Sequence, residues 1–177
     1  MIPHGVVRGR KNPLHYGLPS RLRQARKTAG LTRKAVVQTA GAGQTAMRDI
    51  ETDQRLPTVA TVARLALALG VTAPWLAYGL GDMITEGTTA NTDGMGARLQ
   101  AVRVERAITK AKLGRLADLT APSITQIENG GSSGVHVVEA LALALGISPG
   151  WLAFGIGDRE LMPARRGRPP AQSPDPS

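Results

Sequence analysis

The sequence predicts an all-α protein made of two small five-helix domains in tandem. The stretch GVTAPWLAYGLGD at residues 70–82 returns as GISPGWLAFGIGD at residues 146–158, with seven of thirteen positions identical. The two stretches begin 76 residues apart in a chain of 177, which predicts two copies of one unit. Aromatic residues make up only 3% of the chain, so Leu, Ala, Val and Ile must form the core, and this favours closely packed helices.

The two copies can be aligned over most of their length. Arg21-Leu22 matches Arg98-Leu99 and Ile50-Glu51 matches Ile127-Glu128, each pair 77 residues apart. From Leu65 and Leu141 onward the spacing is 76, so the second copy has lost one residue. The predicted parts of the chain are a basic flexible arm (1–15), a first domain (16–82), a Thr- and Gly-rich linker (83–94), a second domain (95–159) and a disordered, basic and Pro-rich tail (160–177).

Helix boundaries are predicted from capping residues and from apolar residues at helical spacing. In the first copy the start and end residues of the five expected helices are Ser20 and Gly30, Thr32 and Ala40, Gln44 and Glu51, Thr58 and Gly70, and Thr72 and Gly79. The corresponding candidate caps in the second copy are Thr109, Thr120 and Ser148.

The positive charge of the chain is unevenly divided. The net charge is +9, of which residues 16–82 contribute +5 and residues 93–159 only +1. Excess positive charge favours a polyanionic partner such as nucleic acid. An anionic membrane would also attract it, but no basic amphipathic helix is found that could lie on one.

Several other classes of protein are disfavoured. The chain has no Cys, which excludes disulfides and thiolate chemistry and fits the cytoplasm. No signal peptide and no membrane-spanning run are expected. His4, His15 and His136 are scattered, so no metal site is predicted, and the stretch AGAGQTA lacks the ending of a phosphate-binding loop. An enzyme, a cofactor and a small-molecule ligand are therefore not expected.

Two helices joined by a short turn inside a five-helix bundle follow the helix-turn-helix plan. Leu31-Thr32, the turn at Gly41, Ile50-Glu51 and the run LALALGV before Trp75-Leu76 resemble the Cro/repressor-type (XRE-like) DNA-binding family. The second copy shows the same resemblance through Ile108-Thr109, Ile127-Glu128-Asn129-Gly130, LALALGI and Trp151-Leu152. The resemblance covers about 130 of 177 residues and implies two lambda-repressor-like DNA-binding domains.

The turns depart from the family pattern. The family usually carries Ala four residues before the turn Gly, whereas this chain has Val37 and Gly41 in one copy and Gly114 and Asp118 in the other. Asp118 is therefore expected to tighten or bend the second turn.

The resemblance implies that the third helix of each copy (about 44–51 and 121–128) enters the major groove. In the first copy the expected outward-facing residues are Gln44, Thr45, Arg48 and Asp49. Gln and Arg pair with the edges of adenine and guanine. In the second copy the expected readers are Ala121, Thr125 and Gln126, on a face without a cation and with Pro122 in its first turn. That copy either reads DNA weakly or serves in packing or dimerisation.

Several residues are candidates for contacts with phosphates. Arg33 and Lys110 occupy the place where the family has a phosphate-contacting Gln, so they are expected to clamp the DNA backbone. The other candidates are Lys34, Gly43, Arg55, Lys112, Arg115 and Thr120. For each charged side chain alone, an ordinary solvated surface charge is the alternative.

Two pairs of charged residues are expected to be architectural. Arg26 with Glu51, and Arg103 with Glu128, match a buried ion pair of the lambdoid repressors that ties the first helix to the end of the third. The two glutamates are therefore not interpreted as catalytic.

Short basic motifs lie near both ends of the chain. Arg166-Gly167-Arg168-Pro169 is similar to the core of an AT-hook, and Arg8-Gly9-Arg10 is a similar motif. Both suit insertion of arginine into the minor groove, with an ordinary basic tail as the alternative.

The repeated tryptophans are expected to be structural. Trp75 with Tyr78, and Trp151 with Phe154, are three residues apart on a short helix and should pack over the LALAL helix. The alternative is a contact with a second chain or another protein at this end of the bundle.

Together these features predict a sequence-specific regulator of transcription, a repressor that binds double-stranded DNA in the cytoplasm of a prokaryote or in a phage or mobile-element context. The linker has a contour of about 40 Å, so half-sites one turn (about 34 Å) apart are within reach. Because the two recognition helices differ, the preferred site should be asymmetric unless two chains pair. The alternatives are an interaction module (an antitoxin or anti-activator), in which the second domain serves pairing, and a non-specific nucleoid protein.

Overall fold

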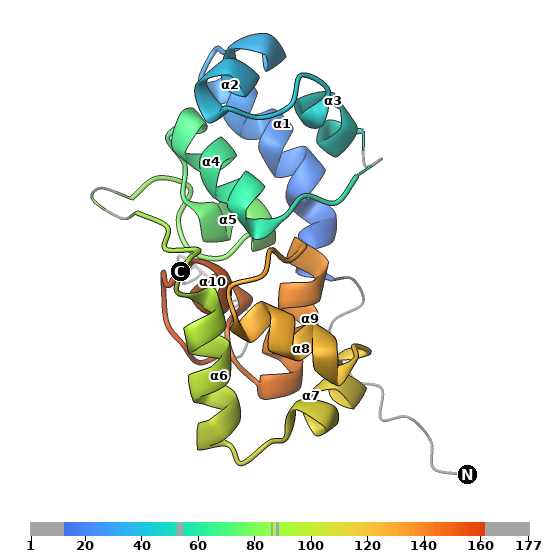
Figure 1. The fold of residues 1–177 in the computed structure, drawn as a ribbon. Helices are drawn as coiled ribbons and strands as arrows, with labels where there is room; N and C mark the ends of the chain where they lie inside the picture. The colour runs from blue at the N-terminus through green and yellow to red at the C-terminus, as the bar shows by residue number, and fades with distance from the viewer. Residues whose placement is uncertain (1–12, 53–54, 86, 88, 162–177) are drawn as a thin grey trace, which may run out of the picture.

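The computed structural model describes residues 13–52, 55–85, 87 and 89–161. The first copy, in the upper half of Figure 1, contains η1 (Leu14–Gly17), α1 (Leu18–Thr28), α2 (Arg33–Ala40), α3 (Ala46–Glu51), α4 (Val59–Leu69) and α5 (Ala73–Tyr78). The second copy, below it, contains α6 (Met95–Glu105), α7 (Lys110–Ala117), α8 (Ala121–Glu128), α9 (Val135–Leu145) and α10 (Pro149–Phe154). The described residues form no strand, and the predicted all-α fold with two five-helix units is confirmed.

Most predicted helix ends are confirmed by their capping bonds. The side-chain oxygens of five caps accept a hydrogen bond from an amide in the first helical turn, namely those of Thr32, Thr58, Thr109, Thr120 and Ser148. Gly41, Gly70 and Gly79 follow their helices in the left-handed conformation, which glycine adopts without a steric penalty.

One predicted cap is wrong. The helix expected to start at Ser20 begins at Leu18, and the Ser20 hydroxyl donates to the carbonyl of Gly17 at 2.9 Å. The helix starts earlier because η1 runs directly into α1. Thr72 stands directly before α5, as predicted, but its side chain accepts no bond from that helix, and its hydroxyl donates to the carbonyl of Asp82 at 2.6 Å.

Equivalent residues of the two copies form the core. Leu22 and Leu99, Met47 and Ile124, and Leu76 and Leu152 are all at most 1% exposed. Since these residues occupy the same places in the alignment, both copies fold into the same bundle.

Two equivalent arginines link the first helix of each copy to its last helix. Arg21 donates to the carbonyls of Leu76 (2.9 Å) and Ala77 (2.7 Å), and Arg98 donates in the same way at the end of α10. These bonds satisfy carbonyls that have no partner within their own short helix. Burial lowers the pKa of Arg21 to about 10, and the nearby charge of Glu139 partly opposes that shift. The alignment of Arg21 with Arg98 was visible in the sequence, but the role of the pair was not.

The Trp-containing ends pack inward and also join the two copies. Trp75 and Trp151 are half-buried against the core, while Tyr78 and Phe154 are fully buried. The rings of Tyr78 and Phe154 lie 6.4 Å apart across the contact between the copies, and the Tyr78 hydroxyl donates to the carbonyl of Val135. α5 therefore packs against α10 within a single chain (Figure 1).

Some residues of the predicted linker, arm and tail make backbone hydrogen bonds to the two domains or belong to their secondary structure. The Met83 carbonyl accepts from the Thr72 amide, and the Asn91 amide donates to the Phe154 carbonyl. Leu14 and His15, within the predicted arm, belong to η1, and Glu160, within the predicted tail, pairs with Ile147. None of the described helices is long and apolar enough to cross a membrane.

Candidate nucleic-acid interface

The helix-turn-helix of the first copy consists of α2, the turn after Gly41, and α3. α3 begins at Ala46, two residues later than predicted, so Gln44 and Thr45 lie in the preceding turn. The alignment explains the difference. Gly43 stands where the second copy has the capping residue Thr120, and no side-chain cap is present at the start of α3. Without that cap the first turn of α3 is not α-helical.

The helix-turn-helix of the second copy is more regular. α8 begins at Ala121 as predicted, with Thr120 as its cap and Pro122 in its first turn, where proline is tolerated. Asp118 has φ of 57°, close to the 59° of Gly41. The expectation that Asp118 bends this turn is therefore wrong, because aspartate takes up the same left-handed conformation as the glycine.

The two helix-turn-helix units differ in the size of the side chain that faces the turn, which is Gly114 in the second copy and Val37 in the first. A Cβ added at Gly114 would lie 2.5 Å from the carbonyl oxygen of Leu119, so the turn approaches α7 closely there. The equivalent residue in the first copy is Val37, which is buried. The larger valine requires the first turn to lie further from its helix.

The predicted readers of the first copy are accessible. Gln44, Thr45 and Arg48 are exposed, and Asp49 is partly buried. The Arg48 guanidinium lies 3.4 Å from the Asp49 carboxylate, with 63% of the arginine side chain exposed. Such a weak exposed pair leaves Arg48 able to turn toward a base edge.

The predicted readers of the second copy are less available. Gln126 is exposed, whereas Ala121 and Thr125 are partly buried. The Thr125 hydroxyl donates to the Ala121 carbonyl at 3.2 Å and accepts from Lys110 Nζ at 3.1 Å. Its only proton and one lone pair are already used. Gln126 is thus the most available reader predicted on this face.

A glutamate with a buried side chain joins α3 and α8 each to the first helix of its own copy. Arg26 Nε lies 2.7 Å from Glu51 Oε1, and Arg103 Nε lies 2.6 Å from Glu128 Oε1. Burial alone would raise the pKa of Glu51, but hydrogen bonds from Arg26 and Arg33 and their positive charges together lower it.

Two predicted phosphate ligands belong to these ion pairs. Arg33 Nε lies 2.6 Å from Glu51 Oε2, and Lys110 Nζ lies 3.3 Å from Glu128 Oε2. Half of the Arg33 side chain is exposed and about a third of Lys110. Their first role in this structure is to neutralise a buried carboxylate, a role that sequence reasoning did not assign to them.

The other phosphate candidates differ in availability. Exposed side chains flank the helix-turn-helix units at Lys34, Arg55, Lys112 and Arg115. Gly43 is exposed in the turn, and the Thr120 hydroxyl is already engaged with the amide and hydroxyl of Ser123. Arg64 was not predicted, yet it is exposed and donates to the Gly41 carbonyl beside the turn at 3.1 Å. Its position on α4, outside the helix-turn-helix, gave no signal in the sequence.

Some predicted residues cannot be placed. Arg8, Arg10, Arg166 and Arg168 of the predicted minor-groove arms lie outside the described residues. Among the residues that are described, no group of three or more His, Asp or Glu side chains could hold a metal ion.

Comparison with known families agrees with this geometry. Residues 18–77 match a family model described as a helix-turn-helix domain, and residues 99–152 match a second model described as helix-turn-helix. Each match spans one copy, from its first helix to its fifth. No solved structure matches the chain. The chain therefore belongs to the helix-turn-helix proteins and carries two XRE-type domains in tandem.

Proposed function

We propose that the protein is a sequence-specific DNA-binding repressor of transcription, without catalytic activity or cofactor, acting in the cytoplasm of a prokaryotic cell. The observation that carries this proposal is the exposed Arg48 on α3, the second helix of a helix-turn-helix. Further exposed cations stand at Lys34 on α2 and at Arg55 after α3. Arginine binds guanine through two hydrogen bonds, while flanking cations bind phosphates.

The two copies are proposed to contribute unequally. α3 presents Arg48 and is preceded by the exposed Gln44, whereas α8 offers mainly Gln126. We expect α3 to supply most of the base discrimination and α8 to refine it. Repression would follow from occupying a promoter and blocking polymerase.

The proposal can be tested by footprinting on DNA upstream of the protein's own gene, with a titration of salt. Specific binding should exceed binding to random DNA at 150 mM salt. Arg48→Ala should weaken specific binding by roughly 10- to 100-fold, the loss of one good base contact, with little effect on random DNA. Arg159→Ala is the matched control, because that arginine pairs with Glu105 in the second copy. Equal affinity for specific and random DNA would refute the proposal.

One observation favours a second candidate function for the second copy. Leu116 on α7 is 55% exposed at the place where the first copy has Thr39. An exposed leucine within a helix-turn-helix fits a contact with another protein, as in an antitoxin or anti-activator. If Gln126→Ala leaves DNA binding unchanged while Leu116→Ala abolishes capture of a protein partner, the second copy is an interaction module.

A further inference from the structure

We infer that one chain is a complete two-fold DNA-binding unit, which presents α3 and α8 to two half-sites in inverted orientation. The inference rests on the proposed DNA-binding function and specifies the DNA: a duplex with two different half-sites facing each other, bound by a single chain.

The first support is a reciprocal exchange of hydrogen bonds between the copies. The Val59 amide donates to the Ser133 carbonyl at 2.9 Å, and the Val135 amide donates to the Pro57 carbonyl at 3.1 Å. Val59 is equivalent to Val135, and Pro57 to Ser133, in the 76-residue register. Exchange of the same bond between equivalent residues is what a two-fold axis produces, whereas a head-to-tail arrangement joins different surfaces.

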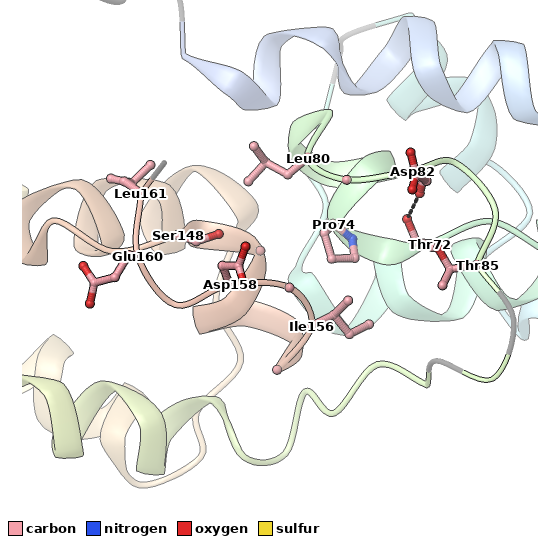
Figure 2. Close-up of a pocket in the computed structure, with 14 residues that line it drawn as sticks. Thr72, Pro74, Leu80, Asp82, Thr85, Ser148, Ile156, Asp158, Glu160 and Leu161 are labelled. Carbon is pink, nitrogen blue, oxygen red and sulfur yellow. Dashed lines mark hydrogen bonds between the residues drawn. The ribbon is translucent and has the colours of Figure 1, made fainter. Parts of the chain in front are cut away.

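The second support lies at the α5–α10 contact. Tyr78 faces its equivalent Phe154, and a Cβ added at Gly150 would lie 2.9 Å from Cβ of its equivalent Pro74. A hollow of about 570 Å³ lies beside this contact and is lined by equivalent residues from both copies (Figure 2). The labelled equivalent pairs are Thr72 and Ser148, Leu80 and Ile156, and Asp82 and Asp158. Two separate contacts thus each join equivalent residues of the two copies, as an approximate two-fold axis requires.

This axis relates the two recognition helices. α3 ends at Glu51 and α8 at Glu128, and the segments that follow them, Pro57–Val59 and Ser133–Val135, are the ones that exchange bonds. In Figure 1 both α3 and α8 lie to the right of the contact between α5 and α10. Helices related by a two-fold axis and placed at the same end of it meet half-sites of opposite orientation.

The half-sites should nevertheless differ in sequence. Arg48 and Asp49 on α3 correspond to Thr125 and Gln126 on α8. Inverted geometry therefore comes with an asymmetric base sequence, which two identical chains related by the same axis would not require.

One further contact between the copies, made by Glu139, has no equivalent under the two-fold symmetry and helps to fix their relative position. Glu139 on α9 is 2% exposed and accepts from the amides of Leu14 (2.6 Å) and His15 (3.1 Å), while its Oε2 lies 2.7 Å from His15 Nδ1. The equivalent residue in the first copy is Ala63. Since a buried carboxylate is costly without these partners, the pairing should be rigid rather than a loose tether.

Selection from a random-sequence duplex library with the full chain tests the inference. We expect enriched duplexes with two different half-sites in inverted orientation, and native mass spectrometry should find one chain per duplex. Enrichment of direct repeats or of a single half-site, or two chains per duplex, would overturn the inference but leave the proposed DNA-binding function intact. Absence of any enrichment would instead refute the proposed function.

Changing the spacing between the two half-sites in the DNA distinguishes a rigid pair of domains from two domains on a flexible linker. Inserting about 5 bp, half a helical turn, between the selected half-sites should weaken binding at least tenfold, because one half-site then faces away. A change of less than twofold would show that the copies move independently on the linker and would overturn the inference.

A disulfide lock tests whether the paired form is the one that binds DNA. The chain has no Cys, so Pro74→Cys with Gly150→Cys introduces a single pair of thiols at facing positions, whose Cβ atoms must separate slightly from 2.9 Å to the roughly 3.5–4.5 Å that a disulfide spans. The oxidised variant should bind the selected duplex within twofold of its own reduced form. A tenfold loss on oxidation would mean that the copies must separate on DNA and would overturn the inference.

Discussion

Glu51 connects three helices of the first copy through its carboxylate. It accepts from Arg26 on α1 and Arg33 on α2, and its own backbone ends α3. The Glu51 side chain is fully buried, so both arginines are needed to offset its desolvation. α3 is therefore held at its end by ion pairs as well as by packing.

The lowered pKa of Glu51 predicts a loss of stability in acid. A carboxyl whose pKa is lower in the folded state stabilises the fold above its ordinary pKa of 4.5, and this contribution disappears as the pH falls through the folded pKa. Glu51→Gln should cost about 3–5 kcal/mol at pH 7, because it leaves the largely buried guanidinium of Arg26 unpaired. Denaturant unfolding at pH 7 and pH 3 should show the gap between wild type and variant shrinking at the lower pH. A gap that is independent of pH would contradict this role.

At the scale of the element, the missing cap of α3 can be restored. Gly43→Thr introduces the residue that the second copy has at the equivalent place, and no atom lies within 4 Å of a Cβ added there. The Ala46 amide, which now donates to the Gly43 carbonyl at 2.9 Å, should donate to the new hydroxyl, as the Ser123 amide donates to Thr120, and the protein should be stabilised by a few tenths of a kcal/mol.

Hydrogen exchange provides the measurement for this variant. The Ala46 amide should exchange more slowly in Gly43→Thr than in wild type, while amides of α8 remain unchanged. Gly43→Ala serves as the control, since it adds a Cβ without a hydroxyl. Equal protection in both variants would show that the late start of α3 has another cause.

The close turn of the second copy predicts intolerance of a larger side chain. Gly114→Val places the residue of the first copy against the carbonyl of Leu119, 2.5 Å from the added Cβ, and should cost about 1–3 kcal/mol. Ala111→Val, at an exposed position of the same helix, is the control for helix propensity. Thermal unfolding compares the two, and similar stability would contradict the proposed close approach.

At the scale of the whole molecule, the Glu139 contact should govern how firmly the copies are joined. Glu139→Ala removes the acceptor of two amides and the partner of His15, and should cost at least about 2 kcal/mol. Hydrogen exchange at Leu14 and His15 should accelerate, whereas Glu105→Ala, at an exposed ion pair, should leave it unchanged. Unchanged protection in Glu139→Ala would show that η1 is held by other contacts.

The sequence by itself determined the two copies, most helix ends and the helix-turn-helix family. These features depend on short-range chemistry. A Thr or Ser cap bonds an amide three residues later, a Gly takes the left-handed conformation after a helix, and apolar residues recur with the helical period. The candidate readers Gln44, Arg48 and Gln126 followed from their places in that pattern, and all three are exposed.

Only the tertiary structure decided which side chains remain free and how the two copies meet. Thr125 and Arg33 looked like DNA contacts, but each already bonds a neighbour brought to it by folding. His15 had no assigned role until packing placed it beside Glu139, 124 residues away. The two-fold pairing likewise depends on complementary surfaces from both copies, and contacts across such separations leave no period or local motif in the sequence that could have revealed them.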